Sequence, residues 1–508
     1  MRVLLINPNR SYPVGKLDPN VGLPLGLMYV AATLERDHIP VSILDCVISP
    51  RTRLLDEGEW TSVGLTQQEV RERLLEENPD IIGVGCMFTA QWDNAVKVIE
   101  TVAATLPGRP IVVGGPHVTV AARKVMEDHP QIDFVIVAEG EISMPRLVHA
   151  IENNHREEFK TIPGLCWRDE NGAIQLNPSE PIRDLDTLPL PAYHLVDIEH
   201  LFELQRRGLY ARDRQYRSAS LITSRGCPYT CTFCSIHMSM GRWWRPHSVD
   251  YVVNHIRFLV EKCGVRHLHI EDDNFTFKAA RTSEICRRLV DEGIRLTWDT
   301  PNGVRADTLT DELMATMKKS GCVGLDVAAE SGDQQVVTNI IKKHIDLGTI
   351  ERAAALGKKH GIRIRCFFVI GFPGETKENI RQTIRFAEHL YAKYNCAPML
   401  NVATPLPGTV LAKQVQQNGY LVRDILPKNF ATATLPTAEG QSMIKTPEFD
   451  PAYIKESCAR LTRNIRLLHA RRLLTHPGEL KHVFQRRVSK MMRRPHSAME
   501  MSAPSAGN

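Results

Sequence analysis

Short apolar runs alternate with amphipathic helical patterns over residues 1–150. Runs of this kind predict buried parallel strands, because such strands are covered on both faces. Between them, apolar residues recur at helical spacing, as on one face of a helix. Residues 51–79 carry many charges and are expected to be a long connection. The predicted strands are Val3–Ile6, Val41–Leu44, Ile81–Val84, Ile111–Val113 and Phe134–Val137, and the clearest helices are Pro24–Glu35, Asp93–Leu106 and Ile142–Glu152. The pattern therefore predicts a doubly wound α/β domain with a Rossmann-like parallel sheet, whose ligands bind beyond the carboxyl ends of the strands.

The pattern changes over residues 151–215, which are rich in proline and polar turns. A turn at Asp169–Gly172 separates two short extended runs, Leu165–Arg168 and Ala173–Leu176. Turn residues between two such runs are typical of a hairpin. We therefore expect a linker that contains a small hairpin.

A second alternation of strands and helices occupies residues 216–410. The predicted strands are Ser220–Ser224, His267–Glu271, Arg295–Asp299, Val323–Ala328, Arg363–Ile370 and Met399–Val402. Six β/α units predict a partial (β/α)6 barrel of the TIM type, in which the chemistry lies at the carboxyl ends of the strands. Residues 411–508 are expected to form a helical C-terminal region with a basic tail.

Composition narrows the class of protein. Of the 508 residues, 43% are hydrophobic and 24% are charged, as in ordinary globular proteins. No apolar stretch is long enough for a transmembrane helix, and no signal peptide is recognised. Twelve cysteines are too few for a secreted disulfide scaffold, so a cytoplasmic location is expected.

The charge of the chain is concentrated in its tail. Residues 460–494 hold eleven Lys or Arg and one acid, a net of +10, which leaves −5 for the rest of a chain whose total is +5. A nucleic-acid partner is therefore not expected. The tail could form a basic amphipathic helix that touches a membrane surface, or a solvated helix against the barrel.

Three cysteines form the strongest chemical motif. Cys227, Cys231 and Cys234 follow the first barrel strand with the spacing Cys-x3-Cys-x2-Cys. Thiolates ligate iron–sulfur clusters, and three of them on a four-iron cluster leave one iron with an open position. The alternative is a zinc site, with His237 or Cys263 as the fourth ligand, although the chain has no second Cys-x2-Cys pair.

The cysteine loop resembles that of the radical S-adenosylmethionine (SAM) enzymes. The resemblance covers about residues 218–410 and implies a [4Fe-4S] cluster on the three cysteines, SAM bound to its open iron, and reductive cleavage to a 5′-deoxyadenosyl radical. Later strand ends continue it with Glu271-Asp-Asp-Asn274, Ala329-Glu-Ser-Gly332, Gly371-Phe-Pro-Gly374 and Thr404-Pro-Leu-Pro407. The residues that it implies for SAM binding are Phe233, Asp272, Asp273, Glu330, Ser331, Gly371 and Pro405. Taken singly, Asp272 and Asp273 could be exposed carboxylates at a strand end, Glu330 could be an acid at a helix N-terminus, and Gly371–Gly374 could be only a turn.

Glycines at strand ends of the first domain suggest that its backbone closely approaches a ligand. None forms GxGxxG, so a nicotinamide-binding fold is not predicted. The layout resembles the cobalamin-binding domain that precedes the barrel in one class of radical SAM enzymes. The residues then expected to bind cobalamin are Asn7, Pro8, Gly83, Gly85, Thr89, Gly114, Gly115, Pro116, His117, Glu139 and Gly140. The first loop lacks the histidine that ligates cobalt from below in many cobalamin domains, and His117 is either an ordinary loop residue or a substitute. A flavin, or no ligand, is the alternative.

The resemblance implies a cobalamin-dependent methyltransferase that acts at an unactivated carbon through methylcobalamin and a 5′-deoxyadenosyl radical. Its substrate would be a small molecule, a natural product or a lipid, and its electron donor a flavodoxin or ferredoxin. Two alternatives stay open: a radical oxidative cyclisation or rearrangement with the same cofactors, and a non-catalytic cobalamin sensor or carrier.

Overall fold

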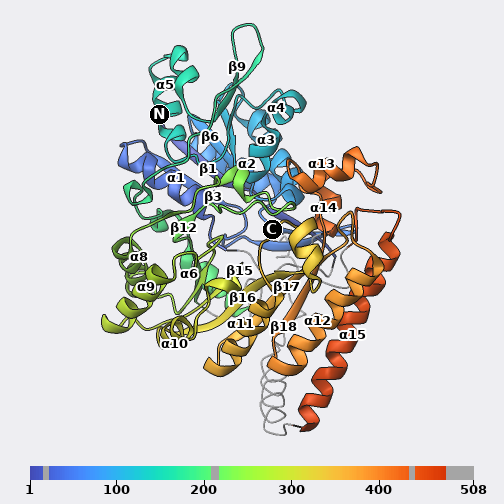
Figure 1. Ribbon diagram of the computed structural model, residues 1–508. Helices are drawn as coiled ribbons and strands as arrows, with labels where there is room; N and C mark the ends of the chain where they lie inside the picture. The colour runs from blue at the N-terminus through green and yellow to red at the C-terminus, as the bar shows by residue number, and fades with distance from the viewer. Residues whose placement is uncertain (15–21, 208–216, 434–440, 476–508) are drawn as a thin grey trace, which may run out of the picture.

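The computed structural model describes residues 1–14, 22–207, 217–433 and 441–475. Two parallel sheets organise these residues, with the first domain above the second in Figure 1. No described helix is long and apolar enough to cross a membrane. The predicted α/β class, with a parallel sheet followed by a second β/α series and C-terminal helices, is confirmed.

The first sheet has seven strands in the order β10-β9-β8-β7-β6-β1-β3. Five of its strands, β8-β7-β6-β1-β3, run parallel and lie between helices, and most of their side chains are buried, as the apolar runs predicted. The main elements are β1 Val3–Asn7, α1 Leu25–Arg36, β3 Val41–Asp45, β6 Ile81–Gly85, η1 Thr89–Gln91, α3 Trp92–Thr105, β7 Ile111–Gly114, α4 Pro116–Asp128, β8 Phe134–Ile136 and α5 Ser143–Glu152.

The expected connection over 51–79 is largely ordered secondary structure, which corrects the prediction from the sequence. A three-stranded antiparallel sheet, β2-β5-β4, precedes a helix, α2. Thr66 caps that helix and Glu69 completes the capping box, so the charges form a helix terminus and a solvated face rather than a loop. The elements are β2 Arg10–Pro13, β4 Arg53–Glu57, β5 Trp60–Gly64 and α2 Gln67–Glu77.

The predicted hairpin extends the first sheet. Its strands are β9 Leu165–Arg168 and β10 Ile174–Leu176, and β9 pairs antiparallel with β8. The remainder of 151–207 runs toward the second domain and contains α6 Ile198–Arg206. The amide of Gln205 there donates to and accepts from the backbone of Ser218 on the first barrel strand, so one side chain occupies part of the open edge of the barrel sheet.

The second sheet has six parallel strands in sequential order, β11-β14-β15-β16-β17-β18. This is the order expected for a partial barrel, and amphipathic helices cover its outer face (Figure 1). The strands are β11 Ser218–Leu221, β14 His267–Ile270, β15 Thr297–Val304, β16 Cys322–Glu330, β17 Arg363–Ile370 and β18 Ala397–Val402. The main helices are α8 Val249–Glu261, α9 Ala279–Asp291, α10 Asp311–Lys319, α11 Leu347–His360 and α12 Lys377–Tyr394.

A short second ladder lies beside the cysteine loop, and helices close the C-terminal region. The ladder pairs β12 Ser224–Arg225 with β13 Arg245–Pro246. Helix α7 Ile236–Ser239 lies between these two strands in the sequence. The last helices are α13 Val410–Gln417, α14 Pro427–Ala433 and α15 Pro451–Thr475. Helix α15 lies along α12 in Figure 1, and its His469 bonds to Tyr391 at 2.8 Å. Most of the basic tail, residues 476–494, lies outside the described residues.

A buried network of ion pairs joins the two domains. Arg225 contacts Glu139 and Glu141, each at 2.7 Å, and Arg245 contacts Glu139 at 2.8 Å. All four side chains are at most 6% exposed. The ring of Tyr29 lies 5.1 Å from the Arg225 guanidinium. Because both glutamates follow β8 and both arginines flank the cysteine loop, this interdomain network holds that loop against the first domain.

Replacing Arg225 with Met should therefore strongly destabilise the protein. Two carboxylates would lose a buried partner, which costs about 3–5 kcal/mol. Thermal and denaturant midpoints of the full chain measure the effect. The matched control is Arg381→Met, whose partner Glu378 is 49% exposed, and there the midpoints should hardly change because water screens the pair. Equal losses in the two variants would contradict the assigned role of the network.

Candidate functional site

Contacts with other parts of the chain hold the cysteine loop. Gly226 has φ +81°, and a Cβ there would lie 2.3 Å from the carbonyl oxygen of Trp243, so only glycine fits. Further along, the Thr232 N–H donates to the carbonyl of Ile341 at 3.0 Å, and its own carbonyl accepts from Leu411 N–H at 2.9 Å. The loop is thus held by its own short ladder, by the segment after β16 and by the segment after β18.

The three cysteine thiols are half-buried, free and close enough to affect one another electrostatically. Burial raises the pKa of all three, that of Cys234 to about 12. The cations Lys343 and Arg305 lower the pKa of both Cys227 and Cys231. Buried thiols that must ionise suit ligation by a metal cluster, and the two nearby cations complement the negative charge of three thiolates.

The spacing of the sulfur atoms argues against a single zinc ion. A tetrahedral zinc site holds its thiolates about 3.8 Å apart. Within the described parts of the chain, three ligand atoms of His, Cys, Asp or Glu lie within 4.8 Å of one another only in a different group, His267, His269 and Asp299. Neither the three cysteines nor a set that adds His237 or Cys263 meets this spacing. The cysteine loop therefore does not have the spacing of a single-zinc site.

The acidic segment after β14 divides into two roles. Asp272 is fully buried and accepts hydrogen bonds from the Thr223 N–H at 2.5 Å, the Thr223 hydroxyl at 2.7 Å and the Ser224 hydroxyl at 2.5 Å. It therefore fixes the strand end that leads into the cysteine loop. Asp273 accepts from the Gly226 N–H, and burial raises its pKa to about 7, with a further contribution from Asp272. Of the two, Asp273 is the carboxyl group that lies beside the cysteines.

The end of β16 carries a strained acid. Glu330 has φ +64° and is 6% exposed, and its carboxylate binds the Lys343 ammonium at 2.7 Å. The negative charge of Glu330 also raises the pKa of Cys231, so Glu330 lies near the three cysteines. The next residue, Ser331, is fully buried, and its hydroxyl contacts that of Thr383 at 2.8 Å. Strain of this kind is typical of ligand sites, and Ser331 serves here to hold the turn.

The remaining predicted SAM residues lie around the same loop. The ring of Phe233 is 5.7 Å from that of Phe372, the residue after Gly371. The N–H groups of Gly371 and Phe372 both donate to buried Glu375, whose pKa burial raises to about 8. Pro405 is buried in the segment after β18, which reaches the cysteine loop through Leu411. The structure thus brings together the strand ends that the sequence singled out.

The predicted cobalamin residues end or follow β1, β6, β7 and β8 at one edge of the first sheet, except Gly83, which lies in the middle of β6. Close packing alone explains two of the glycines: a Cβ on Gly83 would lie 2.6 Å from Leu5, and one on Gly115 would lie 2.4 Å from the Cys86 carbonyl oxygen. A Cβ on Gly114 would meet nothing closer than 3.8 Å. Gly85 and Gly140 pack beside Leu27 and Val30. The side chain of Asn7 donates to Asp45, and Pro8 is buried.

Two residues that the sequence analysis did not select stand out at this edge. Met87 and Phe88, directly after β6, are 51% and 49% exposed. Exposed apolar side chains at the ligand-binding edge of a parallel sheet fit a large, partly apolar ligand such as cobalamin. They are ordinary apolar residues in the sequence, and their exposure is visible only in the structure.

Other predicted cobalamin residues at this edge already contact other side chains of the protein. Glu139 is buried, and both its oxygens contact arginines of the interdomain network. His117 is 8% exposed, its Nδ1 lies 3.1 Å from the Thr89 hydroxyl, and its ring lies 4.8 Å from that of Trp92. Burial lowers the pKa of His117 to about 4. Pro116 begins α4, the helix that packs against α7 of the cysteine loop.

Helix contacts join the cysteine loop to the edge of the first sheet where the predicted cobalamin residues lie. Helix α4 packs on α7, and Gly408 after β18 lies so close to Met238 of α7 that a Cβ would be 2.5 Å from its sulfur. Val120 of α4 lies beside the same glycine. The cobalamin edge of the first domain and the cluster loop of the second are therefore adjacent.

Comparison with known proteins identifies the family. A Radical SAM superfamily model matches residues 221–387, and a B12 binding domain model matches residues 18–148. An uncharacterized methyltransferase of Pyrococcus horikoshii is 30% identical over 425 residues, which cover 83% of this chain and 84% of that protein. The chain belongs to the B12-binding radical SAM enzymes. Its cofactors are accordingly a [4Fe-4S] cluster, SAM and cobalamin, as the sequence predicted.

Two further relatives of this radical SAM enzyme are informative. The cytidylyl-2-hydroxyethylphosphonate methyltransferase of Streptomyces wedmorensis is 28% identical over 83% of this chain and 82% of its own length. The structure of TsrM from Kitasatospora setae, a radical SAM methyltransferase with cobalamin and a [4Fe-4S] cluster bound, has a TM-score of 0.64 at 20% identity, and covers 83% of this chain and 79% of that one. The latter shows a shared fold. Anaerobic magnesium-protoporphyrin IX monomethyl ester cyclases, including one from Rubrivivax gelatinosus at 26% identity over 76% of this chain and 65% of its own length, also match.

Alanine at Cys227, Cys231 or Cys234 should abolish cluster binding, because no other described thiol shares their loop. Iron and sulfide analysis of the anaerobically reconstituted protein measures the loss. Cys263→Ala removes an equally half-buried thiol outside the loop and should leave the iron content unchanged. A full iron content in Cys231→Ala would overturn the ligand assignment.

Cobalamin should bind without a protein imidazole below the cobalt. The loop after β1 has no histidine, and His117 is held by Thr89 in a buried position. The electron paramagnetic resonance spectrum of bound cob(II)alamin should therefore lack nitrogen splitting from the lower face. Clear splitting that disappears in His117→Ala would instead make His117 a ligand.

Proposed function

We propose that this enzyme is a methyltransferase that transfers a methyl group to an unactivated carbon of a small-molecule substrate. The names of two relatives, matched over more than four-fifths of this chain, support methyl transfer. The interdomain network supports a joint active site, because Arg225 and Arg245 hold the cluster loop against the cobalamin edge. A sensor or carrier would not require that contact.

The bound cofactors supply the chemistry: reductive cleavage of SAM at the cluster, and methyl carriage by cobalamin. The chain contributes position and charge. Cys227, Cys231 and Cys234 would hold the cluster and leave one iron open for SAM. Lys343 and Arg305 would offset the negative charge of the three thiolates. Holding two large cofactors in one orientation removes most of the entropic cost of bringing them together.

Exclusion of water is the second contribution of the chain. The apolar pair Phe233 and Phe372 forms one wall beside the cysteines. Ile454 of α15 and Phe449 pack over Gly371, at 3.4 and 3.9 Å from the position of a Cβ. A dry site protects a reactive radical from solvent. The C-terminal region would therefore act as a cover for the SAM loop.

The substrate-side assignments are proposals of the same kind. Asp273 is the carboxyl group best placed for the SAM amino group, because Asp272 is fully used in holding the cysteine strand. Glu330 would receive the ribose, with Lys343 orienting its carboxylate. A flavodoxin or ferredoxin would supply the electron, and the substrate would be a natural product, a lipid or another small molecule.

A second function, radical oxidative cyclisation, is favoured by one observation. Cyclases of magnesium-protoporphyrin monomethyl ester match this chain at 25–26% identity. They match less of the chain than the two methyltransferases and at lower identity, so methyl transfer is the leading proposal.

Product ratios distinguish the two functions. A methyltransferase that uses one SAM as the radical source and another as the methyl donor should form 5′-deoxyadenosine, S-adenosylhomocysteine and methylated product in near-equal amounts. A cyclase should form 5′-deoxyadenosine without substrate-dependent S-adenosylhomocysteine. Turnover with methyl-labelled SAM measures this, and a reaction without substrate gives the background. Absence of label from the product under turnover would exclude methyl transfer.

A further inference from the structure

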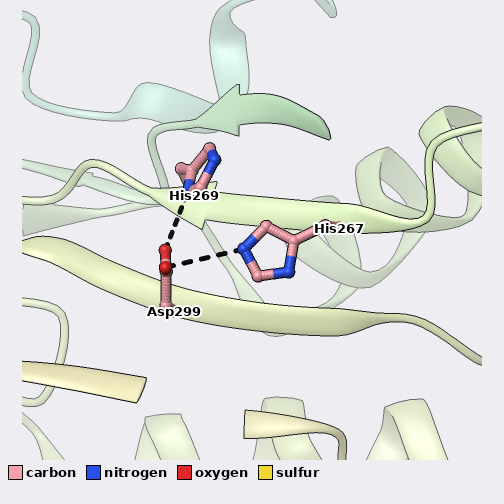
Figure 2. A group of neighbouring side chains, drawn as sticks. All are labelled: His267, His269 and Asp299. Atoms are coloured by element: carbon pink, nitrogen blue, oxygen red, sulfur yellow. Dashed lines mark hydrogen bonds and ion pairs between the residues drawn. The ribbon is translucent and has the colours of Figure 1, made fainter. Parts of the chain in front are cut away.

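A cluster of metal-ligating side chains lies inside the barrel, away from the cysteine loop. His267 and His269 belong to β14 and Asp299 belongs to the adjacent parallel strand β15, with His269 directly opposite Asp299 in the register. Residues two apart in a strand face the same side, so both imidazoles point toward the carboxylate, as Figure 2 shows. The group begins at the amino-terminal end of β14, whereas Asp272 and Asp273 follow its carboxyl end.

The three groups have the composition and burial of a metal site. Their ligand atoms all lie within 4.8 Å of one another, and each residue is at most 8% exposed. The Asp299 carboxylate contacts His269 Nδ1 at 2.7 Å and lies 3.5 Å from His267 Nε2. Two imidazoles with one carboxylate are ligands of zinc and of other divalent first-row metals.

His267 has an outer hydrogen bond on its other ring nitrogen. Thr297 Oγ1 lies 2.7 Å from His267 Nδ1. Nε2, on the opposite side of the ring, faces the Asp299 carboxylate. An outer hydrogen bond of this kind usually orients a metal-bound histidine.

The ring nitrogen of His267 that faces the carboxylate makes no hydrogen bond of normal geometry. Nε2 is buried without a hydrogen-bond partner and lies 3.5 Å from Asp299 Oδ2, a distance that gives a loose ion pair when the imidazole is protonated. In a tetrahedral zinc site, nitrogen and oxygen ligands are about 3.4 Å apart. The His267–Asp299 separation thus already has the length of one edge of a metal site.

We propose that His267, His269 and Asp299 bind one divalent transition-metal ion, such as Zn²⁺, which joins β14 to β15. Binding replaces the His269–Asp299 hydrogen bond and the looser His267–Asp299 pair with three metal–ligand bonds, and a proton on a coordinating ring nitrogen is released to solvent. The ion would be a structural brace beneath the strands that carry the acidic segment at their other ends. Its site is separate from the cluster, so the proposal does not rest on methyl transfer.

The test uses the full chain with Cys227, Cys231 and Cys234 all changed to Ala, which removes the thiolates that would compete for metal. Zn²⁺ alone is the probe, added and then freed of loosely bound metal with a weak chelator. We expect one zinc per chain by elemental analysis, and X-ray absorption with nitrogen and oxygen ligands that include imidazole. Less than about a tenth of an equivalent, or a shell containing sulfur, would overturn the proposal.

Single substitutions locate the site. His267→Gln and Asp299→Asn should each weaken zinc binding at least tenfold and should remove the rise in thermal midpoint that zinc causes. The matched control is His255→Gln, which alters an equally buried histidine whose Nε2 bonds to Tyr193 at 2.8 Å. Binding that survives in His267→Gln would refute the site. If both variants fail to fold, the X-ray absorption of the histidine-intact protein decides, because two imidazoles in its shell support the site and none excludes it.

Discussion

The active site depends on charges that are buried between two domains. Arg225 lies two residues before the first cluster cysteine, and its partners Glu139 and Glu141 follow the last parallel strand of the cobalamin domain. Charges removed from water are tolerated only in pairs with good geometry, so the two domains have one low-energy orientation rather than a range of them. The same ion pairs therefore hold the cluster loop and the cobalamin edge in place relative to each other.

Buried charges also hold strand ends in place within the barrel. Asp272 takes three hydrogen bonds from the strand end before the cysteines, and Lys343 bridges Glu330 and the carbonyl of Ala328. Asp272 ties the end of β14 to the segment after β11, and Lys343 ties the end of β16 to the segment that follows it. The loop that receives the cluster is thus supported by a polar layer whose members are almost all satisfied.

The sequence predicted elements well where one physical signal dominated. Buried parallel strands such as Ile81–Gly85 are continuous apolar runs, and the cysteine spacing is typical of very few kinds of site. The β4–β5 hairpin was not predicted because its strands are short, β4 is charged, and neither strand is a continuous apolar run. Site roles were harder to predict. In the sequence, Glu139, Asp272 and Asp273 are all acidic residues after strands. Only the fold shows that Glu139 pairs with arginines and that Asp272 accepts hydrogen bonds from hydroxyl groups. Arg225 lies 84 residues from Glu141, and no local pattern connects them.

The packing of Phe449 and Ile454 on Gly371 bears on how much of the chain makes up the working unit. The match to the radical SAM family ends at residue 387, yet the glycine turn of that domain receives its covering from residues more than sixty positions later. A shorter protein cut at the family boundary would retain every cluster cysteine and every barrel strand up to β17, and would leave the Gly371 turn without this cover. A turn of the radical SAM domain thus depends for its packing on a helix, and the segment before it, that carry none of the cluster cysteines.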